Sequence, residues 1–345
     1  MKKQVCGGIA LVILVFFLLL PGGPLLASKP IKLSYANFPP AQTFPCVQME
    51  HWKQEVEKRT DGRLVIQTFP GGTLLGAKNM FDGIVMGQAD IGCFAMSYHP
   101  GRFPLAEAVD LPLGWPNAVV ASLTLLDLCN KYQPESFEKV KVLTMFTCPP
   151  ANIMSINPVR SLADLKGMEI RAAGTGVKIF ELLGASPIGM PQSDVPDALH
   201  KKVIKGMASS LEVMKDFNYA EYCRYITMTN LQVVSFAVVM NRSSWDALPD
   251  DIKAVLEGMS AEQAEWTGRY VDEHVNQSVA WSKDTYQVEV ITLADEERLK
   301  MDELLKPLVD DYISRTQGKV PSEDIIRDIR SLKAKYSGDL VGQSK

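Results

Sequence analysis

The residue of this sequence best suited to bind a charged ligand is Arg171. It ends an expected strand, residues 168–171, and comes directly before the glycine-containing loop 174–176. In α/β proteins ligands commonly bind where strands end, and a planar guanidinium offers two parallel N–H donors to a carboxylate. Taken on these residues alone, the better interpretation is still a surface arginine paired with a nearby acid.

Motifs that would indicate catalysis or a metal centre are missing from the sequence. His51, His99, His200 and His274 are far apart and share no metal-ligand spacing, and neither HExxH nor GxSxG occurs. Gly174-Thr175-Gly176 follows a strand as a nucleotide loop does, but its third glycine is missing. We therefore expect no catalytic residue, no metal ion and no cofactor.

A secreted α/β enzyme acting on a small organic acid is the alternative function, and an adhesive protein is a third. Ligand-induced stabilisation without turnover would indicate a receptor.

The composition is that of a globular protein that does not bind nucleic acid. The chain has 345 residues, of which 22% are charged, and a formal net charge of −4. This length suffices for two domains. No basic tract is long enough to form a nucleic-acid surface.

The N-terminus has the layout of a secretory signal peptide. Lys2 and Lys3 precede the uncharged apolar run 5–20, and prolines and glycines follow before Ala27. We expect cleavage near Ala27, so that residues 1–27 are removed. The alternative is an uncleaved membrane anchor, but the run is shorter than the roughly 20 residues that span a bilayer.

The cysteines of the mature chain are scattered. They are Cys46, Cys93, Cys129, Cys148 and Cys223, and no CxxC pair occurs. We interpret most of them as buried small apolar residues, although an exported protein can form a disulfide that sequence alone does not pair.

Expected strands alternate with helices along the chain, which predicts an α/β fold. A helical pattern of about forty residues follows Pro249, longer than an ordinary globular helix, and we expect it to bridge two domains with a break allowed. The expected strands are 31–36, 64–69, 91–94, 140–146, 152–156, 168–171, 232–240 and 288–293.

A set of short segments occurs in a characteristic order along the mature chain. The first half contains 57–64 (EKRTDGRL), 69–76 (FPGGTLLG), 87–91 (GQADI) and 110–112 (DLP), and the second half contains 161–171 (SLADLKGMEIR), 183–187 (LGASP), 190–191 (MP), 198–199 (AL), 240–241 (MN) and Trp245. Each segment alone is a turn or a strand edge. In this order they resemble the DctP family of receptors of TRAP (tripartite ATP-independent periplasmic) transporters, over nearly the whole mature chain.

The resemblance implies a two-lobed periplasmic-binding-protein-like fold with a long domain-bridging helix. We expect lobe I to comprise 29–150 and 238–276, lobe II to comprise 151–237 and 277–325, and residues 326–345 to form a polar C-terminal tail. The strand near Val234 should cross between the lobes.

The resemblance also implies a function. A periplasmic receptor would capture a small organic acid and deliver it to a permease with small and large integral membrane subunits, driven by an ion gradient. Arg171 is similar to the arginine of the family that pairs with the substrate carboxylate, and with the resemblance we favour this role.

The sequence departs from the family pattern at two places. The window 148–152, where many members have a second arginine, contains none. Residues 205–210 (KGMASS) replace an Asp-Gly-x-Glu-Asn-type segment. These departures favour a monocarboxylate with an apolar or hydroxylated remainder, bound by Arg171 and by the hydroxyls of Ser209 and Ser210.

Further candidate ligand-binding residues come from loops. Asn230 stands where the family often has Asn or His near the pocket, and an equally good interpretation is that Asn230 caps a turn. Asn152 is a further candidate for an anchoring contact with the ligand. The other candidates follow expected strands, and for each of them core packing is at least as good an interpretation: Phe38, Thr43, Ser97, Tyr98 and Phe146.

Overall fold

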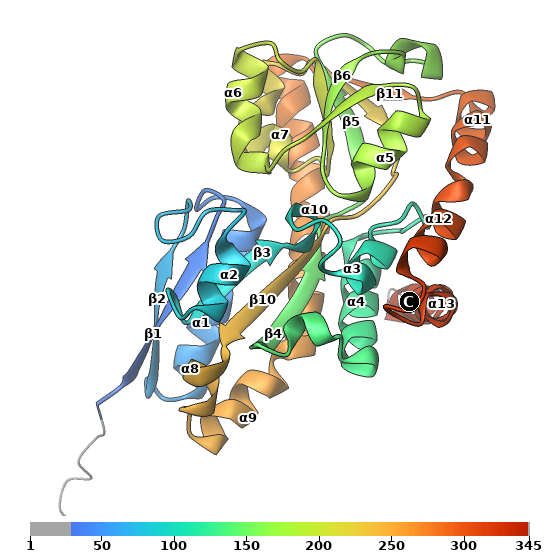
Figure 1. Ribbon diagram of the computed structural model, residues 1–345. Helices are drawn as coiled ribbons and strands as arrows, with labels where there is room; N and C mark the ends of the chain where they lie inside the picture. Colours follow the sequence, from blue (N-terminus) through green and yellow to red (C-terminus); the bar gives the residue numbers. More distant parts are fainter. Residues whose placement is uncertain (1–28, 344–345) are drawn as a thin grey trace, which may run out of the picture.

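The protein consists of two α/β lobes, each built around its own sheet (Figure 1). The computed structural model describes residues 29–343. The expected signal peptide, residues 1–27, lies outside the described residues. The five cysteines of the described chain are free and buried, as the sequence indicated for most of them. None of the helices within residues 29–343 is long and apolar enough to cross a membrane.

Lobe I contains a five-stranded sheet of order β2-β1-β3-β10-β4. β1 pairs in parallel with β2 and β3, whereas β10 lies antiparallel between β3 and β4. All seven residues of β10 are buried, which explains its continuous run of apolar residues. The strands are β1 (Ile31–Asn37), β2 (Leu64–Phe69), β3 (Ile91–Ala95), β4 (Val140–Thr147) and β10 (Ser235–Asn241), and the helices are α1 (Phe44–Arg59), α2 (Met80–Val85), η1 (Met96–Tyr98), α3 (Pro104–Val109), α4 (Ala118–Tyr132), η2 (Glu135–Phe137), α8 (Arg242–Asp246) and α9 (Asp250–Gly258).

Lobe II contains a six-stranded sheet of order β11-β9-β5-β8-β6-β7. β5 lies antiparallel to β8 and β9, while β6 is parallel to β7 and β8. Each of these strands has four residues, and β7, β8 and β9 were not predicted. The strands are β5 (Asn152–Ser155), β6 (Glu169–Ala172), β7 (Ser186–Gly189), β8 (Gly206–Ser209), β9 (Tyr225–Met228) and β11 (Glu289–Thr292), and the helices are η3 (Leu162–Leu165), α5 (Thr175–Leu182), η4 (Gln192–Asp194), α6 (Val195–His200), α7 (Val213–Asp216) and η5 (Tyr219–Glu221).

Between β4 and β11, three segments connect the lobes. Residues 148–151 lead from β4 to β5, and residues 229–234 lead back from β9 to β10. These two segments are hydrogen-bonded to each other, since Cys148 N donates to Val234 O (3.0 Å) and Leu231 N donates to Ala151 O (3.0 Å). The third connection is α10 (Ser260–Tyr286), which runs from one lobe to the other in Figure 1. The expected long helix is therefore present, with its break at Met259.

The boundaries differ in detail from those expected. The predicted strand 232–240 begins at Ser235, because residues 229–234 form the crossing segment, so residues 235–237 belong to the sheet of lobe I. The exact residue ranges of the lobes stay a prediction.

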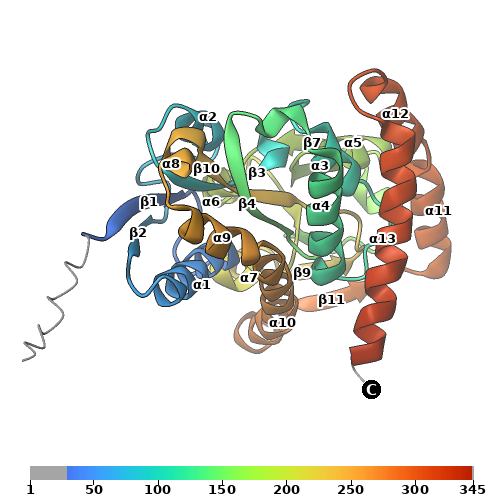
Figure 2. The ribbon, with the colours of Figure 1, turned by 90° about the horizontal axis from the view of Figure 1, so that it is seen from below.

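The C-terminus is not the expected polar tail. After α11 (Asp295–Leu305) and α12 (Pro307–Thr316), residues 322–343 form helix α13 (Ser322–Gln343), which packs on α4 and α3 of lobe I. Figure 2 shows α13 lying along this side of the molecule. Ile325, Ile326 and Ile329 are buried in that contact. The apolar residues are spaced along one face of a mostly polar helix, and one such face is enough to attach it to the lobe.

Candidate functional site

A cavity of about 50 Å³ lies between the two lobes. Lobe I contributes residues that follow β1 and β3 and one residue of β10, and lobe II contributes residues of β6 and β8 and the segment through α7. A larger cleft of about 740 Å³ opens beside it, with Tyr98 and Ala173 lining both. The residues that line the smaller cavity are Phe38, Pro39, Thr43, Phe44, Pro45, Tyr98, Cys148, Arg171, Ala173, Gln192, Ser209, Ser210, Glu212, Val213, Asp216, Phe217, Val234 and Phe236.

Arg171 in β6 is 2% exposed and points its guanidinium to this cavity. Its Nε donates to Met190 O (3.0 Å), Nη1 donates to Ala208 O (3.3 Å), and Nη2 donates to the Tyr98 hydroxyl (3.5 Å). A guanidinium has five N–H donors, so two remain after these contacts. The three partners are two carbonyls and a phenol, so the buried positive charge faces no formal negative charge among them.

Contacts across the cavity hold the lobes together. The Tyr98 hydroxyl of lobe I accepts a hydrogen bond from Gln192 N of lobe II (3.0 Å), in addition to its contact with Arg171. Gln42 Nε2 of lobe I donates to Asp216 O of lobe II (2.9 Å). The lobes therefore enclose the cavity.

Ser97 of lobe I and Gly174 of lobe II are in close contact. Gly174 follows β6 and has φ +52°, a conformation that favours glycine. A Cβ added to Gly174 would lie 2.6 Å from Ser97 Cβ. Ser97 itself lines the larger cleft and not the smaller cavity.

A second group of polar residues follows β8. The side chain of Ser210 donates to Glu212 Oε1 (2.7 Å), and Glu212 is 3% exposed. Burial raises the pKa of the Glu212 carboxyl to about 7. Its other oxygen, Oε2, is buried and has no hydrogen-bond partner among the described residues.

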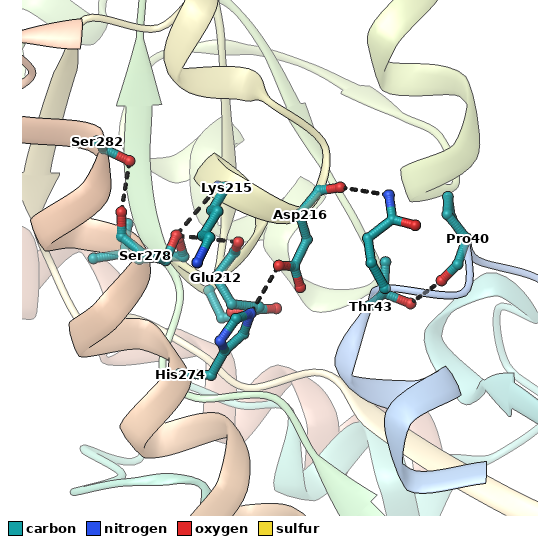
Figure 3. A network of polar contacts seen from close by, with 11 residues as sticks. Pro40, Thr43, Glu212, Lys215, Asp216, His274, Ser278 and Ser282 are labelled. Carbon is teal, nitrogen blue, oxygen red and sulfur yellow. Dashed lines mark hydrogen bonds and ion pairs between the residues drawn. The ribbon is translucent and has the colours of Figure 1, made fainter. Parts of the chain in front are cut away.

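A hydrogen-bonded pair of a histidine and an aspartate lies beside Glu212, as Figure 3 shows. His274 Nε2 of α10 lies 2.7 Å from Asp216 Oδ1 of α7, and the hydrogen bond to this carboxylate raises the pKa of His274. The pair joins the bridging helix α10 to the wall of the cavity.

The wall from lobe I is aromatic. Phe236 lies parallel to Phe38 (6.5 Å between ring centroids) and edge-on to Phe44 (5.5 Å). Phe146 stacks on Phe236 from behind (5.5 Å) without lining the cavity itself. The site therefore combines an aromatic wall with a polar wall that contains a guanidinium group and carboxyl groups.

Most of the predicted site residues meet here. Arg171, Ser209, Ser210, Phe38, Thr43 and Tyr98 line the cavity. Thr43 donates its hydroxyl to Pro40 O (2.7 Å), so this hydroxyl is already used within lobe I.

Four predicted residues lie outside the lining: Ser97 and Phe146, as described above, and the two asparagines Asn152 and Asn230. The side chain of Asn152 donates to Pro150 O (3.1 Å) and accepts from the backbone N–H groups of Thr229 and Asn230 (2.7 and 3.0 Å). Asn230 is exposed with φ +46°. This geometry matches the turn alternative for Asn230 and gives Asn152 the role of stabilising the turn.

Glu212, Asp216, Gln192, Phe44 and Phe236 line the cavity but were not predicted. Glu212 had a usable signal, since it follows the predicted Ser209-Ser210 pair by two residues. Asp216 and Gln192 had none, because only the fold brings their segments to the cavity.

The comparisons with known proteins decide the family. The model of the bacterial extracellular solute-binding protein family 7, DctP, matches residues 35–316. The chain belongs to this family. A TRAP periplasmic solute-binding protein from Desulfovibrio salexigens, described as an open complex, is 54% identical with a TM-score of 0.81, covering 89% of this chain and 97% of that one.

More distant members of the family show the same fold. A marine-metagenome TRAP solute-binding protein specific for aromatic acids, in complex with 3-hydroxybenzoate, is 26% identical with a TM-score of 0.85, covering 90% of this chain and 99% of that one. The 2,3-diketo-L-gulonate-binding periplasmic protein YiaO of Escherichia coli is 26% identical, covering 70% of this chain and 74% of that one. The protein is therefore a TRAP solute-binding receptor and not an enzyme.

Proposed function

We propose that this DctP-family receptor captures a small monocarboxylate with an apolar or hydroxylated remainder, and that Arg171 binds the carboxylate. One observation carries the proposal. The Arg171 guanidinium is buried at a cavity between the lobes, and its contacts are with neutral groups only. A buried charge needs a counter-charge, and a ligand carboxylate would supply it through the two remaining N–H donors.

The apolar wall supports a ligand with a flat remainder. Phe38, Phe44 and Phe236 line the cavity and contact one another in stacked and edge-on geometry. Aromatic groups prefer offset or edge-on contacts of this kind. A relative that binds 3-hydroxybenzoate shares 26% of its residues with this chain and fits the same ligand class. The polar wall has Arg171 as its one arginine, which fits one carboxylate better than two.

The lobes are arranged as expected for a ligand-binding, closed state. The Tyr98 hydroxyl of lobe I contacts Arg171 and Gln192 N of lobe II across the cavity. These contacts support capture by closure of lobe I over a ligand held by lobe II.

Export and delivery complete the proposal. Residues 1–27 have the layout of a signal peptide, and the family acts in the periplasm, so the mature receptor would act there. It would deliver its ligand to a permease with a small and a large integral membrane subunit.

A thermal-shift screen followed by calorimetry tests the ligand class. The panel contains benzoate, 3-hydroxybenzoate, phenylacetate and mandelate, with succinate as a dicarboxylate and benzamide as a neutral isostere of benzoate. We expect monocarboxylates to raise the Tm without being consumed; a ligand at 100 times its Kd stabilises the fold by about 2.7 kcal/mol. Equal stabilisation by benzamide or stronger stabilisation by succinate would contradict the proposal.

A further inference from the structure

Glu212 is a buried acid at the candidate site that binding of a carboxylate by Arg171 does not explain. It follows β8 by three residues, precedes α7, and lines the same cavity as Arg171. Only 3% of the residue is exposed. A carboxylate is an unfavourable group to bury beside a site for an anion, because the two negative charges repel.

The two oxygens of Glu212 have different surroundings. Oε1 accepts the hydroxyl of Ser210 at 2.7 Å, which fixes the orientation of the carboxyl group. Oε2 is buried without a hydrogen-bond partner among the described residues. A buried acceptor without a partner is unfavourable, and such atoms persist where a ligand or a function uses them.

The charged neighbours of Glu212 do not satisfy Oε2. Asp216, four residues further along the chain, is paired with His274 of α10 at 2.7 Å, and Figure 3 shows this pair next to Glu212. Asp216 repels a negative charge on Glu212, whereas His274 attracts this charge. Cys148 of the crossing segment is the other titratable group that interacts with Glu212. Because His274 is committed to Asp216, Glu212 Oε2 is left without a partner among the described residues, on a side chain that lines the cavity.

We propose that Glu212 accepts a hydrogen bond from a hydroxyl or N–H group of the ligand, so that the receptor selects acids that carry such a donor. This inference rests on the proposed function, because it takes the ligand carboxylate to be held by Arg171. The ligand class is then a monocarboxylate with a second, hydrogen-bond-donating group, and the Glu212 carboxylate distinguishes it from the same acid without the donor.

The test compares acids that differ only in the donor. One series is benzoate, 3-hydroxybenzoate and 3-methoxybenzoate; the other is phenylacetate, mandelate, O-methylmandelate and phenylglycine. We measure the affinities of the wild-type receptor by calorimetry. In at least one of the two series, we expect the hydroxy acid to bind at least about tenfold more tightly than its parent acid and than its methyl ether. Tighter binding of phenylglycine than of mandelate would identify the donor as an ammonium group in place of a hydroxyl.

Glu212→Gln and a matched control complete the test. The Gln side chain has the same shape but loses the charge, so the preference for the hydroxy acid should shrink about tenfold. The affinity for the parent acid should not fall, because a repelling negative charge is removed. Glu273→Gln makes the same change at an exposed position of α10 and should leave the preference intact. The wild-type comparison of ligands does not depend on the folding of either variant.

The outcomes separate the two proposals. If the acids bind but hydroxy acids bind no tighter than their parents, or if Glu212→Gln keeps the full preference, the role of Glu212 is refuted and the monocarboxylate function stands. If none of these monocarboxylates binds the wild-type receptor, the proposed function fails, and the role of Glu212 fails with it.

Discussion

The two walls of the inter-lobe cavity differ in chemistry. Lobe I contributes mostly rings and prolines, among them Phe38, Phe44 and Phe236, whereas lobe II contributes Arg171, Gln192, Ser209, Ser210, Glu212 and Asp216. Tyr98 of lobe I reaches the polar wall through its contacts with Arg171 and Gln192 N, and Gln42 of lobe I reaches it through Asp216 O.

This difference suggests a division of labour. Hydrogen bonds and charge pairs depend strongly on geometry, so the polar wall would determine which ligand is held. Apolar contacts depend mainly on area removed from water, so the aromatic wall would add affinity with less selectivity and cover the ligand as the lobes close. Substitutions on the two walls should therefore have different effects.

The largest effect is expected from Arg171→Ala on the polar wall. If Arg171 pairs with the ligand carboxylate, its loss leaves that carboxylate unpaired in an enclosed site, which costs about 3–5 kcal/mol, or roughly two to three and a half orders of magnitude in Kd. Arg171→Lys should restore part of the affinity, because an ammonium group cannot make the forked contact. Calorimetry measures both.

The melting temperature must be measured alongside, because Arg171 also donates to two carbonyls of lobe II. Losing these contacts costs about 1 kcal/mol each, so the variant should fold with a lower Tm. Arg160→Ala, at an exposed ion pair with Glu289 in the same lobe, should leave binding intact. Normal ligand affinity in Arg171→Ala would show that Arg171 has only this structural role.

The polar wall also shows what the sequence could predict. Arg171, Ser209 and Ser210 were found because the family resemblance and the order of the strands indicate them. Glu212 was missed because a lone acid in an irregular segment has no pattern of its own; its burial and unpaired oxygen are consequences of the fold. Asn152 was expected at the pocket, but its amide is used by the neighbouring turn, a local contact that residue type does not reveal.

The fold was predictable to a similar degree. The strands of lobe I were predicted from their apolar runs, and the long bridging helix from apolar residues at helical spacing. Strands β7, β8 and β9 of lobe II were missed, although the equally short β5, β6 and β11 were predicted; β7 (SPIG) and β8 (GMAS) contain glycine, and β7 a proline, which are depleted in strands. Helix α13 was taken for a tail because most of its residues are polar, although Ile325 and Ile329 suffice to attach it to lobe I.

The next largest effect concerns the pH dependence of stability. The pKa of Glu212 is raised from an ordinary value of 4.5 to about 7 by burial, so its protonated form is favoured in the folded state. The resulting stability is fully present below pH 4.5 and is lost as the pH rises through about 7. The shift corresponds to about 3 kcal/mol. Glu212→Gln should remove this slope from the pH profile of the free energy of unfolding, measured by urea denaturation without ligand.

His274 is the necessary control for that measurement. Its pKa is raised by Asp216, so its contribution to stability is also lost as the pH rises through its folded pKa. His274→Gln should remove the part of the slope due to His274, while the part due to Glu212 should persist at a higher pH, because the attraction that lowers the pKa of Glu212 is lost. An unchanged slope in Glu212→Gln would mean that the Glu212 carboxyl titrates as an ordinary acid in the folded state.

A smaller effect is expected from Gly174→Ala, which acts on the contact between the walls. The new methyl group would lie 2.6 Å from Ser97 Cβ of lobe I, and the φ of +52° is unfavourable for alanine. Closure should become less favourable, by about 1–3 kcal/mol, and ligand affinity should fall by at least about tenfold. Gly184→Ala introduces a methyl at φ +84° with no atom within 4 Å, so it should lower Tm without changing Kd. Equal Kd values for the two variants would argue against a role of this contact in closure.

The smallest effect is expected from Phe236→Leu on the aromatic wall. Phe236 contacts Phe38, Phe44 and Phe146, and each aromatic pair contributes about 0.5–1.5 kcal/mol beyond the area it buries. Leucine keeps most of the apolar area, so the affinity for every aromatic acid should fall by a similar factor of about three to ten, with the ratio between hydroxy acid and parent acid unchanged. Phe137→Leu, in the separate aromatic cluster with Phe81 and Phe103, should lower stability and leave Kd as it was. If Phe236→Leu changed the ratio between the two acids, the aromatic wall would take part in selecting the ligand, and the division between a selecting wall and a covering wall would be wrong.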